Sequence, residues 1–178
     1  MSFPGVNIEV SNDNLLQEVG VLDGVPCLCA TATQPVNIHA LKSVYSLSDA
    51  ESKGFTEASE PFLHDLIETY YNELGGKQLL YIYGTAETET MADELTYTNN
   101  LGVLAAVNGS RGSINLIAIA RKPVAGYNAG ANFLDTDVES AVIASRTLCK
   151  SLQNANTPVR VFIEGRVANE TAPIAPVY

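Results

Sequence analysis

The sequence has few basic residues and very few histidines. Its 178 residues include 10 lysines and arginines against 20 aspartates and glutamates, which gives a formal net charge of -10. With that charge and no Lys/Arg cluster, the chain would repel nucleic-acid phosphates and anionic lipids, so we expect no nucleic acid and no membrane as partner. The two histidines, His39 and His64, lack the spacing of a two-histidine metal site. The sequence therefore predicts no metal site.

Cysteines and long apolar runs are also scarce. The three cysteines form no regular framework, and an odd number of this kind favours a reducing compartment. Cys27 and Cys29 lie two residues apart in an apolar run, so a strand there would direct both to one face as small buried hydrophobes. The N-terminus lacks a basic region followed by an apolar core, and no apolar run has transmembrane length. We therefore expect neither a signal peptide nor a transmembrane helix.

Catalytic motifs are missing as well. The Gly-x-Ser-x-Gly elbow of serine hydrolases is absent. No glycine-rich loop ends in the Lys-Ser or Lys-Thr pair that a phosphate-binding loop requires. These absences predict no catalytic residue and no cofactor, and hence a protein that is not an enzyme. A second hypothesis stays open, a small-ligand-binding or enzymatic α/β domain that uses the loop with Gly126 and Gly130 and the helix start up to Glu139. Asp135 and Asp137 in that helix start would repel phosphate and more simply favour the helix dipole.

The residues that are present suit one globular domain. Hydrophobic residues make up 46% of the chain and charged residues 17%, which is enough for a sizeable core. Strand patterns alternate with helical patterns along the chain. One helical region, residues 88–107, is predicted to break near Asn99-Asn100. The alternation predicts an α/β fold, a single domain with a mostly parallel or mixed sheet flanked by helices. The predicted strands cover residues 25–32, 36–40, 78–83, 114–120 and 159–163, and the last three share one sheet.

Two of the predicted helices carry clear boundary signals. Apolar residues at three- and four-residue spacing predict a helix over residues 61–74, with His64 on its polar face and a stop at Gly75. A later, long helix is predicted to open with a capping box formed by Thr136 and Glu139. Each of these helices directs one apolar side toward the sheet.

An extended N-terminal arm precedes these elements. Val6, Ile8 and Val10 alternate with polar residues, so they fall on one face of a strand, and Pro4-Gly5 interrupts the backbone ahead of them. Such a strand suits addition to another subunit's sheet, although on the arm alone an edge strand of its own sheet is the simpler interpretation. The candidate subunit-contact residues are Phe3, Pro4, Val6, Ile8 and Val10.

The chain divides into three parts on this basis. Residues 1–14 are the arm, residues 15–168 the α/β domain, and residues 169–178 an irregular tail without helical or strand periodicity. The tail is either a second exchangeable arm or the place where a longer protein has been cut.

The order of these segments resembles the N-terminal part of contractile phage tail sheath proteins, or of the sheath-like proteins of related injection machines. The resemblance begins with the Pro4-Gly5-Val6 opener and the extended segment that follows it. It continues with a strand rich in small residues, a helix rich in aromatic residues with a Gly-Gly stop, and a late strand. These segments cover residues 27–33, 62–83 and 158–165.

The resemblance implies a structural function. Copies of the chain would stack in rings or helices around a tail tube protein and be linked by terminal arms. Contraction would be a rigid-body change between subunits and would need no catalytic residue. The family also implies assembly in the bacterial cytoplasm, followed by a place in a virion tail or injection-machine particle. Sheath proteins are usually much longer, so the resemblance implies either a truncated sheath protein or a short relative.

Overall fold

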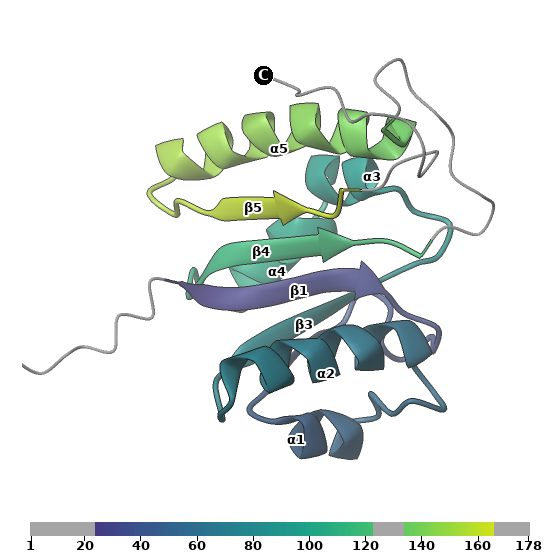
Figure 1. The fold of residues 1–178 in the computed structure, drawn as a ribbon. Coiled ribbons are helices and arrows are strands. Elements are labelled where there is room, and N and C mark those ends of the chain that lie inside the picture. The colour runs from purple at the N-terminus through teal and green to yellow at the C-terminus, as the bar shows by residue number, and fades with distance from the viewer. Residues whose placement is uncertain (1–23, 123–133, 166–178) are drawn as a thin grey trace, which may run out of the picture.

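The computed structural model describes residues 24–122 and 134–165, and these residues form one α/β domain (Figure 1). The described strands make a five-stranded sheet in the order β2-β3-β1-β4-β5. The strands are β1 (Val25–Thr31), β2 (Leu41–Val44), β3 (Leu80–Thr85), β4 (Ile114–Ala120) and β5 (Arg160–Ile163). The helices are α1 (Leu47–Ser52), α2 (Pro61–Leu74), α3 (Met91–Thr96), α4 (Gly102–Gly109) and α5 (Thr136–Asn154).

The sheet is mostly parallel, as the alternation of segments predicted. β1 pairs in parallel with β3 on one side and with β4 on the other, β4 pairs in parallel with β5, and only the edge strand β2 is antiparallel. The chain moves from β1 to β3 and later returns to the far side of β1 as β4. The carboxyl ends of β1 and β4 therefore form the topological switch point of the sheet.

Helices cover both faces of the sheet and create two apolar cores. Successive strand residues point to opposite faces, so Leu28 and Ala30 face α1 and α2, whereas Cys27 and Cys29 face the other helices. Figure 1 shows α1 and α2 on one side of the sheet and α3 and α5 on the other. Each large apolar side chain buried in these cores contributes about 1.5–3 kcal/mol.

Several local predictions are confirmed. α2 begins at Pro61 and ends where Gly75 takes a left-handed conformation with φ 62°. The predicted break at Asn99-Asn100 separates α3 from α4. None of the helices in 24–122 and 134–165 is long and apolar enough to cross a membrane. The arm at 1–14, the glycines Gly126 and Gly130, and the tail at 169–178 lie outside the described residues.

Three local predictions were wrong. Residues 36–40 form turns instead of a strand, because His39 has a left-handed φ of 56° and only Ile38 bridges to β3. The N-cap of α5 is Asp135 and not Thr136 as predicted. The Asp135 side chain accepts a hydrogen bond from the Asp137 amide, and Thr136 is the first residue of the helix. His64 is buried instead of solvated, and its Nε2 lies 3.3 Å from Glu51 Oε1 because α1 packs beside α2.

The cysteines are free thiols, and the pair in β1 is buried as predicted. The Sγ atoms of Cys27 and Cys29 lie 3.8 Å apart, and the hydrogen bond between them, together with burial, raises the pKa of Cys29. Cys149, on α5, is only half-buried, although burial raises its pKa too.

Because Cys149 is partly exposed and the other two cysteines are buried, we expect Ellman's reagent to titrate one thiol, that of Cys149, in the native chain. The reaction should be slow, because the thiolate is the reactive form and the raised pKa of Cys149 keeps the thiol protonated. The other two thiols should react only in denaturant. As a control, Cys149→Ser should make the folded chain unreactive. Rapid reaction of two or more thiols under native conditions would contradict the packing of β1.

Candidate functional site

The outer edge of β5 is the first candidate for an interaction surface. β5 ends the strand order, and among the described strands only β4 pairs with it. The Glu164 amide donates to Ile119 O of β4 at 2.9 Å. Because backbone direction alternates along a strand, the Val161 and Ile163 amides point away from β4, toward the open edge. This edge can accept a further strand.

An apolar groove lies next to that edge, on the sheet face that α2 covers only in part. Its volume is about 360 Å³. Phe162 borders it with 57% of its surface exposed, a large value for a phenylalanine. The groove reaches Pro26 at the start of β1, and its main apolar lining is Leu66, Tyr70, Leu80, Leu116, Ala118 and Phe162. We call the open edge of β5 and this groove together the β5 surface.

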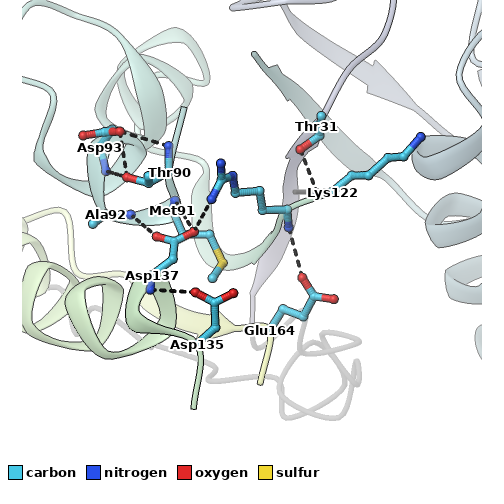
Figure 2. A network of polar contacts seen from close by, with 10 residues as sticks. Thr31, Thr90, Met91, Ala92, Asp93, Lys122, Asp135, Asp137 and Glu164 are labelled. Atoms are coloured by element: carbon cyan, nitrogen blue, oxygen red, sulfur yellow. Dashed lines mark hydrogen bonds and ion pairs between the residues drawn. The ribbon is translucent and has the colours of Figure 1, made fainter. Parts of the chain in front are cut away.

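A second candidate lies at the carboxyl ends of the parallel strands, where Figure 2 shows a network of polar contacts. Arg121 follows β4, and its Nη1 lies 3.2 Å from Asp137 Oδ2 in α5. The same carboxylate accepts from the Met91 and Ala92 amides at the start of α3, at 3.2 and 3.3 Å. One side chain thus joins the start of α3, the start of α5 and the end of β4.

Two further bonds complete the network at the strand ends. The Lys122 amide donates to Thr31 Oγ1, and the Arg121 amide donates to Glu164 Oε2, both at 3.0 Å. In open α/β sheets this switch point is where ligands usually bind. Here the carboxylate of Asp137 is already engaged by α3 and Arg121. The hypothesis of a small-ligand site at Gly126, Gly130 and this helix start stays a prediction, because both glycines lie outside the described residues.

A third group of polar side chains lies past the end of β3, around His39. The turn after β1 reaches this place because Gly84 has no side chain. A Cβ at Gly84 would overlap the Asn37 carbonyl oxygen, and the His39 amide donates to Gly84 O at 2.8 Å. His39 Nε2 then lies 3.2 Å from Glu89 Oε1, and His39 Nδ1 lies 3.3 Å from the Tyr83 hydroxyl.

Glu94 of α3 faces the same group from the inside. It is 2% exposed, and within the described residues no hydrogen-bond donor lies in bonding geometry with either of its carboxylate oxygens. Burial, and after it the neighbouring Glu89 carboxyl, raise the pKa of Glu94 to about 10. Burial also raises the pKa of Tyr83 to about 12, although the Gly102 amide opposes this change. We call His39, Glu89 and Glu94 the β3-end cluster.

Sequence reasoning did not find either the β3-end cluster or the network of Asp137. His39 was assigned to a strand, and Glu89 and Glu94 fell within a broad helical region, so no spacing rule linked the three. The signal that could have been used is Thr90, which with Asp93 forms a capping box at the start of α3. That signal would have placed Glu89 in a loop at the carboxyl end of a strand.

Comparison with models of known protein families finds no match, and neither does comparison with curated proteins. Among solved structures, the chain is similar to the anti-feeding prophage (AFP) helical sheath, determined by cryo-EM in its contracted state. The TM-score is 0.46 and the sequence identity is 18%. The match covers 97% of this chain and 42% of that chain, so this chain spans less than half of the sheath chain's length.

Proposed function

We propose that this chain is a structural subunit of a contractile tail-sheath-like assembly and that it joins neighbouring subunits by strand addition. The order of sequence segments, which resembles that of sheath proteins, supports this role. The β5 surface is the observation that carries the proposal. In this role copies of the chain stack in rings or helices around a tube protein. They move as rigid bodies during contraction, so the chain itself needs no catalytic residue.

The β5 surface offers what strand addition requires. Backbone groups of Val161 and Ile163 at the open edge supply hydrogen bonds to an incoming strand, and the groove supplies a site for its apolar side chains. The occupant that we propose is residues 3–10 of a neighbouring copy. If that segment is extended, the spacing of Val6, Ile8 and Val10 would direct all three to one face, which suits an apolar groove that borders one face of an edge strand.

Phe162→Lys is expected to weaken this contact without unfolding the domain, because Phe162 is already mostly exposed. A fluorescent peptide of residues 1–14 is titrated with the full chain, and binding is followed by anisotropy. The lysine places a charge in the groove and removes the burial of a large apolar side chain. We therefore expect binding to weaken by at least about tenfold.

Ile143→Lys is the matched control. Ile143 is also a large exposed apolar residue, 69% exposed, but it belongs to α5 and does not border the groove. This variant should bind the peptide as the unchanged chain does, and circular dichroism should report the same fold for both variants. Equal weakening by both lysines, or no binding to the unchanged chain, would mean that the β5 surface does not receive the arm.

A further inference from the structure

The β3-end cluster brings together one imidazole and two carboxylates from three separate segments. His39 comes from the turn after β1, Glu89 from the loop after β3, and Glu94 from α3. One ligand atom from each residue can be chosen so that all three lie within 4.8 Å of one another. We propose that His39, Glu89 and Glu94 bind a divalent transition-metal cation. This site is separate from the β5 surface and does not depend on the proposed assembly function.

The distances within the cluster suit a small cation. Two ligand atoms on one tetrahedral zinc ion lie roughly 3.3 Å apart, given bond lengths of about 2.0–2.2 Å. His39 Nε2 and Glu89 Oε1 already lie 3.2 Å apart. Glu94 then has to move inward by no more than roughly 1.5 Å, which a rotation of its side chain can supply. His39 is 29% exposed in its side chain, so a cation can reach the cluster from solvent.

Glu94 supplies the independent reason to expect a ligand here. A buried carboxyl is normally satisfied by hydrogen bonds or by a bound cation. Glu94 is almost fully buried and lies beside His39 and Glu89, yet among the described residues its oxygens have no hydrogen bond apart from one that a proton shared with the Glu89 carboxyl would make. Two occupants could satisfy it, a proton shared with Glu89 or a metal cation. The imidazole of His39 beside the two carboxylates favours the cation.

The outer contacts of the cluster resemble those that orient metal ligands. The Tyr97 hydroxyl donates to Glu89 Oε1 at 2.8 Å, and the Ala86 amide donates to Glu89 Oε2 at 2.8 Å. The Tyr83 hydroxyl lies at His39 Nδ1, which leaves Nε2 directed at Glu89. Hydrogen-bond partners of this kind hold the metal-binding side chains in position, and their loss typically weakens metal binding by about 10–100-fold.

One nitrogen and two carboxylate oxygens are a ligand set for Zn²⁺, Mn²⁺ or Fe²⁺ more than for Ca²⁺, which takes oxygen ligands only. Three protein ligands leave at least one coordination position for water. The expected order of affinity is Zn²⁺ above Mn²⁺ above Mg²⁺.

The test is isothermal titration of the full chain, without a histidine tag, with zinc, manganese or magnesium chloride alone. We expect one Zn²⁺ per chain, and a saturable rise in melting temperature that EDTA reverses. His39→Asn and Glu94→Gln should each weaken Zn²⁺ binding by about 100-fold or more, and Tyr97→Phe by about tenfold. Asparagine is chosen at position 39 because it tolerates the left-handed backbone there.

His64→Gln is the matched control. His64 also contacts a glutamate, Glu51, at 3.3 Å, but it belongs to no group of three or more possible ligands among the described residues. This variant should bind Zn²⁺ as the unchanged chain does. If His39→Asn proves unstable by circular dichroism, Glu94→Gln and Tyr97→Phe decide the question. No saturable Zn²⁺ binding, or binding that Glu94→Gln and His39→Asn leave intact, would overturn the proposal in favour of the shared proton.

Discussion

Deletion of residues 1–10 is expected to leave the α/β domain folded but to prevent sheath-like polymers from forming. The two apolar cores and the five described strands are built from residues after position 24, so the deletion removes none of the residues that form them. It does remove Val6, Ile8 and Val10, the residues proposed to enter the β5 surface of a neighbour. Circular dichroism measures the fold, and electron microscopy of the deleted and undeleted proteins measures the polymers.

The two interpretations of the arm give different outcomes in this experiment. If the deleted protein still polymerises normally, the arm does not link subunits. If the deletion unfolds the domain, the arm is an edge strand of its own sheet. A substitution of Asn7 and Glu9 by serine is a useful control, because it keeps the apolar face of the arm and should preserve polymers.

Asp137→Ala is expected to lower the free energy of unfolding by about 3–5 kcal/mol, which is the usual cost of breaking a buried ion pair. Asp137 is buried, pairs with Arg121 and accepts from two amides at the start of α3. Domains of this kind are stable by only about 5–15 kcal/mol, so the change removes a large share of the total. Urea unfolding followed by circular dichroism measures it.

Asp93→Ala is the control for this prediction. Asp93 also serves the start of α3, since its Oδ2 accepts from the Thr90 amide at 2.9 Å, but its side chain is exposed. Its replacement should cost about 1 kcal/mol or less. Similar losses in the two variants would show that the Asp137 network adds no more than an ordinary helix cap.

Local patterns determined the class of the fold. β4 is apolar on both faces because both faces are packed against other elements in the centre of the sheet, and that pattern is visible in the sequence alone. The boundaries of α2 follow from Pro61 and Gly75, whose backbone preferences act without help from the rest of the chain. Cys27 and Cys29 point to one face because strand side chains alternate.

Contacts between distant segments determined the rest. His39 leaves the strand pattern because Gly84, 45 positions further along, lets the turn pack against the end of β3. His64 is buried only because α1 packs beside α2 and brings Glu51 to it. The β3-end cluster and the Asp137 network each join segments that are far apart in the chain, so no local spacing reveals them. The sequence by itself determined four of the five described strands and the position of α2, because those preferences are local, but it misplaced β2 (Leu41–Val44) at residues 36–40. Only the tertiary structure decided which polar side chains meet and which edge is left unpaired among the described strands, because both depend on the order in which the strands pair.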